Sequence, residues 1–199
     1  MNKFGVNFMI SKTKMSIFQS AIKVFSVNGY DGATMDDMAQ EAGVAKGTLY
    51  YHFKSKEEIF KYIITEGMEL IKEQLEAAAV REKDSLSKLK AICTLQLNLV
   101  NEKKDFFKVI MSQLWGQEMR QLELRDIIQK YICNLEKYIK EAIDDGLIKN
   151  GDPYFMAYTF FGALCSAAVY ELINKDKNKN DIEDISESLM QNILHGIQA

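Results

Sequence analysis

Thr34-Met-Asp-Asp-Met-Ala-Gln-Glu-Ala-Gly-Val-Ala-Lys-Gly-Thr-Leu-Tyr-Tyr-His-Phe53 is the stretch of sequence that decides the fold. Thr34 is a favourable N-cap, and the apolar residues after it recur at the spacing of one buried helix face. Gly43 suits the left-handed backbone conformation that often ends a helix. The stretch therefore predicts a short helix, a tight glycine turn and a second short helix.

The second helix is predicted over residues 46–53, with one buried side and one outer side. At about 100° per residue, Leu49 lies at the centre of the buried side, next to Ala45 and Phe53. The outer side has a glycine for close approach, hydroxyl groups and cations, and residues 42–55 contain no acid. This layout is typical of a helix that enters the major groove of DNA. A small core segment whose tyrosines only pack is the alternative.

Amphipathic helices are predicted on both sides of this pair. Residues 13–28 carry an apolar stripe that ends at Asn28-Gly29. Ser55 and Glu58 have the spacing of a capping box at the start of a helix over residues 55–79. We expect the upstream helix to pack behind the glycine turn and to complete a three-helix unit.

Residues 13–60 resemble the DNA-binding domain of the TetR family of one-component bacterial repressors. The strongest part of the match is the run Lys46-Gly-Thr-Leu-Tyr-Tyr-His-Phe53. Ala45 is a departure, because family members often carry a capping serine or proline there and alanine caps poorly. The other matching positions are Phe25, Gly29-Tyr30, Ala33-Thr34, Ala39, Ala42-Gly43-Val44 and Lys56-Glu57.

The resemblance implies DNA contacts of two kinds. Lys46, Gly47 and Tyr50 are the candidates for base edges, although Tyr50 could instead be a packing residue. The candidates for phosphate contacts are Thr34, Thr48, Tyr51, His52 and Lys56.

The charge of the chain limits how it can bind nucleic acid. The net charge is −3, with a sequence pI near 5.5. Residues 1–60 carry seven Lys against six Asp and Glu, a net of +1, and the rest carries 18 against 22, a net of −4. Any DNA contact must therefore be a local basic patch with marked salt sensitivity. A structural, nucleoid-type DNA binder is disfavoured for the same reason.

Cysteine and histidine usage gives little reason to expect a metal or a disulfide. The chain has three cysteines, far apart, and two histidines, without a CxxC pair. We expect neither a metal site nor a cofactor. The thiols are expected to be buried, and the location is expected to be reducing and cytoplasmic. An enzyme is the other functional class to weigh. The acidic pairs Asp36-Asp37 and Asp144-Asp145 sit at helix ends, and no catalytic motif is present. Enzymatic activity is therefore not expected.

The rest of the chain predicts an all-α protein, since it has one proline and no convincing strand pattern. The helix over 104–114 is expected to bury Phe107, Ile110, Met111 and Leu114. The last helix is expected to bury a stripe that runs from Ile182 to Ile197. Further helices are predicted over residues 85–101, 118–145, 153–174 and 181–197.

Residues 1–60 are therefore predicted to form the helix-turn-helix DNA-binding domain. Residues 61–199 resemble the family's helical inducer-binding and dimerisation module. For any single pocket residue ordinary core packing is the alternative. The predicted pocket lining is Gln96, Phe107, Met111, Trp115, Tyr131, Asn134 and Tyr158.

The helix over 153–174 is apolar around its whole circumference and carries small residues that permit close approach of another helix. We expect helices 153–174 and 181–197 to form a homodimer with their symmetry mates, the alternative being burial within one chain. Residues 153–170 also reach the length of a membrane span, but a buried bundle helix is favoured and no membrane is expected. Together with the resemblance, these features predict a dimeric repressor that binds a palindromic operator in double-stranded DNA and is released by a small, largely apolar inducer.

Overall fold

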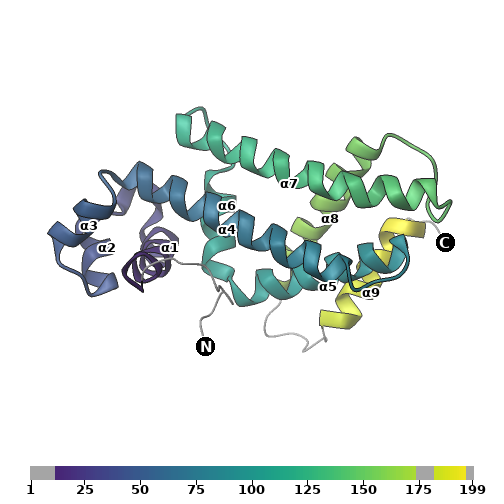
Figure 1. Ribbon diagram of the computed structural model, residues 1–199, viewed down its shortest axis with the longest axis horizontal. Coiled ribbons are helices and arrows are strands. Elements are labelled where there is room, and N and C mark those ends of the chain that lie inside the picture. The colour runs from purple at the N-terminus through teal and green to yellow at the C-terminus, as the bar shows by residue number, and fades with distance from the viewer. Residues whose placement is uncertain (1–11, 174–181, 196–199) are drawn as a thin grey trace. The chain divides into compact units, whose positions relative to one another are not determined.

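The computed structural model describes residues 12–173 and 182–195 (Figure 1). All regular secondary structure in these ranges is helical, which confirms the all-α prediction. The helices are α1 (Lys12–Gly32), α2 (Met35–Ala42), α3 (Lys46–His52), α4 (Lys56–Ala79), α5 (Ser85–Glu102), α6 (Lys104–Gln113), α7 (Met119–Asp144), α8 (Pro153–Ile173) and α9 (Ile182–His195).

Local sequence fixes the ends of the first helices, as predicted. The Thr34 hydroxyl oxygen accepts the N–H of Asp37 at 3.1 Å, and the Asp37 carboxylate accepts the N–H of Thr34 at 3.2 Å. Gly43 ends α2 at φ 65°, in the left-handed region that favours glycine. In α1, Gly29 at φ 70° interrupts the helical geometry, where the sequence predicted the helix to stop. These caps explain why two short helices form so close together.

One compact unit combines residues up to Leu70 with residues 104–128. It holds α1, α2, α3 and the first half of α4, together with α6 and the start of α7. Within it α1 contacts both α2 and α6, and α2 contacts α3. Figure 1 shows α1, α2 and α3 gathered around the beginning of α4. Its core is apolar and includes Ile17, Phe18, Phe25, Met38, Leu49, Ile59 and Phe60.

A close approach between α4 and α6 marks this unit. A Cβ atom added at Gly67 would lie 2.3 Å from the Phe106 ring, which is itself buried. The missing side chain of Gly67 therefore makes room for that ring. A nearby ion pair joins Lys61 of α4 to Glu123 of α7 at 2.8 Å.

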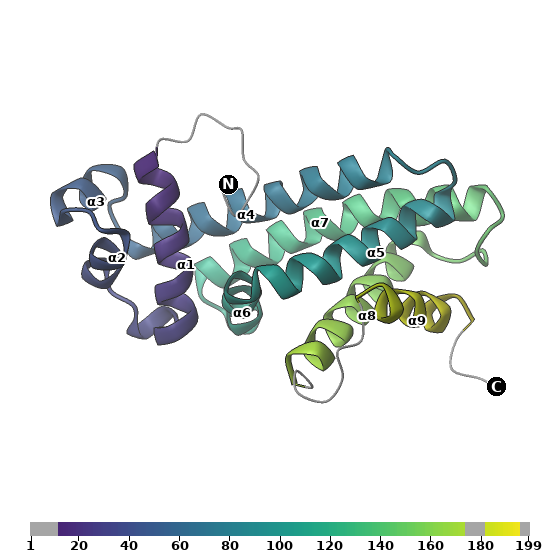
Figure 2. The ribbon, with the colours of Figure 1, turned by 90° about the horizontal axis from the view of Figure 1, so that it is seen from below.

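The second compact unit contains residues 71–103 and the chain from Gln129 onward. Here α5 contacts α8 and α9, as Figure 2 shows. The Thr94 and Ser186 hydroxyl groups are 2.8 Å apart and join α5 to α9, as does an ion pair between Lys90 and Glu187 at 3.6 Å. Both α4 and α7 contribute residues to each unit. The units divide the chain by compactness, so the functional boundary between residues 60 and 61 stays a prediction.

The buried faces of two helices differ from the expectation. In α6 the buried residues are Phe106, Val109, Ile110 and Gln113, whereas Phe107 is half-buried and Met111 is exposed. The Phe106 ring fills the space at Gly67, and this contact turns the buried face of α6 by one residue. In α9, Ser186 and Met190 are the buried positions, and the predicted Ile197 lies outside the described residues. Ala45, expected beside Leu49, is exposed because it precedes the first turn of α3.

The cysteines are less uniform than expected. Cys93 is buried, whereas Cys133 and Cys165 are half-buried. Burial raises the pKa of the Cys93 thiol to about 12 and that of Cys165 to about 11. Within the described ranges, no helix has the length and hydropathy needed to cross a membrane. The same residues hold no group of three or more His, Cys, Asp or Glu side chains suited to a metal ion.

The Gly67 contact makes a direct prediction for stability. Gly67→Ala should lower the free energy of unfolding by about 1–3 kcal/mol, because the new methyl group collides with a ring that is itself buried. Gly47→Ala is the matched control, since no atom lies within 4 Å of the added Cβ. It should leave stability unchanged or raise it by up to about 1 kcal/mol. Urea unfolding measures both, and equal stabilities would contradict the close approach.

Candidate nucleic-acid interface

Helix α3 is held by its buried side and not by its cap. Leu49 is completely buried, and Phe53 at the end of the helix is nearly so. Ala45 takes the N-cap position with an extended backbone and without a side-chain hydrogen bond, as the departure at this position predicted. The seven residues of α3 are too few to form a stable helix alone. Packing of Leu49 and Phe53 therefore fixes the helix in place.

The opposite side of α3 faces outward. An added Cβ at Gly47 would meet no atom within 4 Å, so another molecule can approach the backbone closely. Tyr51 is 78% exposed and Tyr50 is 44% exposed. The exposure of Tyr51 excludes a purely packing role for that residue. Tyr50 is half-covered, so both interpretations given for it remain compatible with its position.

An acidic partner lies beside Lys46. The Lys46 ammonium forms an ion pair with the Asp36 carboxylate from the first turn of α2. The hydrogen bond to Asp36 raises the pKa of Lys46, so the ammonium stays charged. Residues 42–55 contain no acidic residue in the sequence, but the fold places the carboxylate of Asp36 next to them. Helical periodicity could not predict this pair, because it joins two helices across the turn.

The end of α3 carries a further cation and a modified capping box. Lys54 Nζ donates to the carbonyl oxygen of Tyr50 at 2.9 Å. Ser55 Oγ accepts the N–H of Glu58 at 3.3 Å, as the capping box predicts. The Glu58 carboxylate, however, accepts the N–H of Lys54 at 2.7 Å instead of the N–H of Ser55. His52 contacts the Tyr51 ring edge-on, with ring centres 5.1 Å apart.

Two of the predicted phosphate contacts already have structural partners. The Thr34 hydroxyl donates to Asp37 at 2.7 Å and caps α2. Lys56 Nζ donates to the carbonyl oxygens of Tyr30, Asp31 and Ala33 at 2.9, 3.2 and 3.2 Å. An ammonium group has three donors, so these carbonyls use them all. A phosphate contact by Lys56 stays a prediction and would require the loss of one of these bonds.

The predicted ligand residues fall in both compact units. Gln96 and Tyr131 are buried in the second unit, where the Tyr131 hydroxyl donates to Gln96 Oε1. Asn134 and Tyr158 belong to the same unit and bond to Glu76 and Tyr154, respectively. The remaining three, Phe107, Met111 and Trp115, belong to the first unit. Trp115 is 82% exposed.

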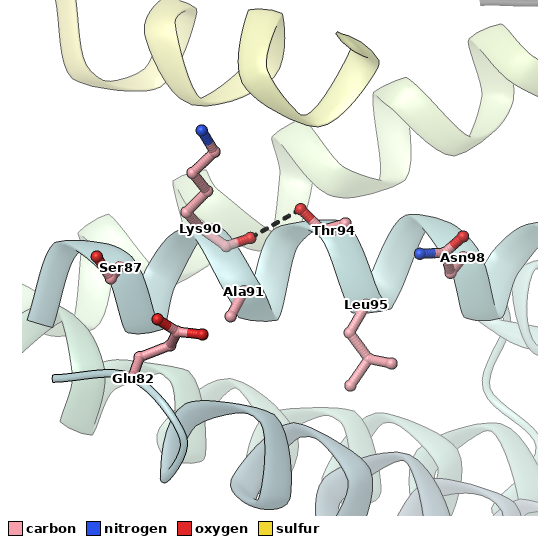
Figure 3. Close-up of a pocket in the computed structure, with 7 residues that line it drawn as sticks. All are labelled: Glu82, Ser87, Lys90, Ala91, Thr94, Leu95 and Asn98. Atoms are coloured by element: carbon pink, nitrogen blue, oxygen red, sulfur yellow. Dashed lines mark hydrogen bonds between the residues drawn. The ribbon is translucent and has the colours of Figure 1, made fainter. Parts of the chain in front are cut away.

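A hollow of about 410 Å³ lies along α5 in the second unit. Figure 3 shows Lys90 and Thr94 on the side of α5 nearer α9 and Leu95 on the other side. None of the predicted ligand residues lines it, since Gln96 projects from the opposite side of α5 at 100° per residue. The lining residues are Glu82, Ser87, Lys90, Ala91, Thr94, Leu95 and Asn98.

The sequence of this chain is similar to those of known bacterial regulatory proteins. The family model described as bacterial regulatory proteins, tetR family, matches residues 17–63. The fatty acid metabolism regulator protein of Bacillus subtilis is 30% identical over 190 residues, which cover 92% of this chain and 94% of that protein.

Solved structures are similar over nearly the whole chain. A Clostridium perfringens protein described as a candidate fatty acid metabolism regulator is 44% identical, with a TM-score of 0.85, over 92% of this chain and 99% of that one. The transcriptional regulator FadR of Bacillus subtilis, solved in complex with stearoyl-CoA, is 25% identical, with a TM-score of 0.82 and the same coverage of both chains.

The Lys46–Asp36 pair gives a test of the interface. Asp36→Asn should free Lys46, which on DNA without its preferred sequence can contact a phosphate instead of a base edge, so that binding to a random-sequence DNA duplex tightens. The slope of log K against log salt should steepen by about 0.9 for each Lys46 that gains a phosphate. Fluorescence anisotropy over a series of NaCl concentrations measures both quantities.

Glu41→Gln is the matched control for this change. It removes the same charge from the same helix, but Glu41 pairs with Lys23, which the interface does not include. Equal effects of the two substitutions would show that only net charge matters, and would remove Lys46 from the interface.

Proposed function

The chain belongs to the TetR family of bacterial transcriptional regulators, and we propose that it represses genes of fatty acid metabolism until a long-chain acyl-CoA releases it from DNA. The observation that carries the DNA-binding part is the outward face of α3, held by the buried Leu49. A glycine, hydroxyl groups and cations occupy that face. These groups suit a major groove, which presents base edges flanked by phosphates.

The proposed contacts with DNA are those that the resemblance implies. Lys46, Gly47 and Tyr50 would read base edges, each good contact being worth about 1–3 kcal/mol of discrimination. Contacts to phosphate would fix the register of the helix on DNA. They are proposed for Thr34, Thr48, Tyr51, His52 and Lys56.

A homodimer on a palindromic operator is supported by one face of α8. Exposed apolar and small residues recur along this helix at spacings of three and four, including Phe155, Gly162, Val169 and Ile173. Such a face is unfavourable in water and suits a second helix at close distance. We propose that α8 and α9 pair with those of a second copy. Two recognition helices related by a two-fold axis would then read two half-sites.

The acyl-CoA effector is proposed from the relatives and from one polar pair. Two of the similar proteins are fatty acid metabolism regulators by description, and the transcriptional regulator FadR of Bacillus subtilis was solved with stearoyl-CoA. In this chain Gln96 and Tyr131 are buried polar residues, and Tyr131 contacts Phe161. Burial raises the pKa of the Tyr131 hydroxyl, which therefore stays a proton donor. A pair of this kind suits a carbonyl group within an apolar site. The cytoplasm is the compartment that holds both DNA and acyl-CoA.

The other predicted ligand residues stay proposals, each considered within its own unit. Asn134 and Tyr158 offer polar groups near the surface of the second unit. Phe107, Met111 and Trp115 offer apolar surface on the first unit. Repression and ligand binding are linked, because a ligand that weakens DNA binding by some factor must be weakened by DNA to the same extent.

Release by an acyl-CoA is directly testable. The wild-type protein first selects an operator from a random-sequence duplex library. Stearoyl-CoA should then weaken binding to that operator by roughly 5- to 150-fold, the usual range of coupling between two sites. Free coenzyme A and stearate, each at the same concentration, serve as controls. Equal operator affinity with and without stearoyl-CoA would refute the effector, while selection of no sequence would refute the regulator.

The proposed dimer has its own test. Val169→Glu places a charge on the exposed face of α8 and should convert the protein to monomers, because an unpaired carboxylate is unfavourable in an apolar contact. Asn150→Glu is the control, since it adds the same charge at an exposed position outside the helices. Light scattering coupled to size exclusion gives the mass of each variant. A dimeric Val169→Glu protein would contradict the assignment of this face.

A further inference from the structure

Arg120, in the first turn of α7, makes an unusual set of contacts for a side chain that the sequence did not single out. Its side chain is only 18% exposed. The guanidinium carbon lies 3.9 Å from the centre of the Tyr30 ring. Nε donates to Gln113 Oε1 at 3.3 Å, and the remaining nitrogens lie 3.8 Å from Asp31 and 3.9 Å from Glu118. Arg120 thus joins α6 and α7 to the end of α1 within one compact unit.

Tyr30 is itself fixed on its other sides. Its ring is stacked on Phe25, with centres 5.5 Å apart and planes 9° from parallel, and it meets the edge of Phe60 at 5.3 Å. Its hydroxyl donates to Glu57 at 2.8 Å. Burial and the bond to Glu57 raise the pKa of Tyr30, so the hydroxyl stays protonated. The ring therefore provides a rigid surface for the guanidinium.

Tyr30 lies near the end of α1, directly before the helix-turn-helix. Lys56 lies over the Tyr30 ring at 4.8 Å and donates to two carbonyls in the last turn of α1 and to that of Ala33 just after it. Thr34, the cap of α2, follows immediately. Whatever fixes Tyr30 also fixes where α2 begins, and through the Gly43 turn it fixes α3.

The α6–α7 pair on the other side of Arg120 is also rigid. Arg125 Nη1 donates to the carbonyl oxygens of Leu114 and Gly116 at 3.1 and 2.9 Å, which ties the turn between the two helices. Gln121 Oε1 accepts the N–H of Glu118 at 3.0 Å in the same turn. A movement of residues 104–128 would therefore be a movement of one piece.

We propose that Arg120 is a positioning residue for DNA binding. It holds the end of α1 against the α6–α7 pair and so sets the orientation of α2 and α3. A ligand that displaces the α6–α7 pair moves the recognition helix through this contact, a part of the inference that rests on the proposed function.

The contacts of Arg120 differ in how much they contribute. Asp31 and Glu118 are exposed, and exposed ion pairs contribute little to stability. Stacking on a ring that is shielded on its other face is stronger, and it needs the flat guanidinium group. Lysine at this position would keep the charge but lose the planar contact and the bond to Gln113. Shape, not charge, is therefore the property to test.

The test compares Arg120→Met with Lys61→Met in the full chain. Both substitutions remove one positive charge, and both break an ion pair that involves α7, but Lys61 does not contact Tyr30. Affinity is measured for the duplex that the wild-type protein selects, without ligand and with stearoyl-CoA. Arg120→Met should weaken operator binding by about fivefold, and the weakening by stearoyl-CoA should fall toward none. Lys61→Met should stay within about twofold of wild type in both measurements.

Arg120→Lys extends the test and replaces Arg120→Met if the latter does not fold. It should behave like Arg120→Met if the planar contact matters, which a role in net charge alone would not produce. A folded Arg120 variant with wild-type operator affinity and wild-type release by stearoyl-CoA would overturn the inference. A variant with weakened operator affinity but wild-type release would overturn the claim that this contact transmits the effect of the ligand. If stearoyl-CoA does not release the wild-type protein, the proposed effector is wrong. Operator affinity without ligand then decides the role of Arg120.

Discussion

Burial of Leu49 is the interaction on which the DNA-binding surface depends. Helix α3 has seven residues, an alanine at its N-cap and no side-chain cap, so it has almost no stability of its own. Burial of its apolar face, which includes contact with α2, is what makes it a helix. The same contact decides which residues face outward, because the angle per residue then places Gly47 and Tyr51 on the far side. A recognition surface on so short a helix is thus a consequence of the core beneath it.

The lysines around this surface are paired within the protein, and this pairing determines how it can bind DNA. Lysines near α3 are already engaged: Lys46 with Asp36, Lys54 with the carbonyl of Tyr50, and Lys56 with three carbonyls. Such pairing weakens non-specific attraction to phosphates, which depends on free cations. The pairing also holds the lysine side chains in defined positions. The arrangement favours discrimination between sequences over affinity for DNA in general, and the proposed pairing of two copies on one site would compensate for the modest affinity of each.

The sequence correctly predicted the features that depend only on neighbouring residues in the chain. The cap at Thr34, the left-handed Gly43 and the buried Leu49 follow from residue type and spacing alone, and the structure confirms them. The face of α6 was predicted wrongly, because it depends on the gap at Gly67, which lies in another helix. For the same reason the sequence could not reveal the Asp36–Lys46 pair or the stacking of Arg120 on Tyr30. These contacts join residues that the fold brings together, and no periodicity records them.

The size of an allosteric effect limits the kind of contact that can carry it. Coupling between two sites is typically about 1–3 kcal/mol. A packed core residue such as Phe60 contributes more than this, about 3–5 kcal/mol on truncation, so a ligand that had to disrupt it would unfold the unit. Exposed ion pairs contribute about 0–1 kcal/mol and are too weak to transmit a change. A partly buried cation over an aromatic ring, at about 0.5–2 kcal/mol, falls in the required range. The contact between Arg120 and Tyr30 has this character, and it lies within one compact unit, at the end of the helix that precedes the helix-turn-helix.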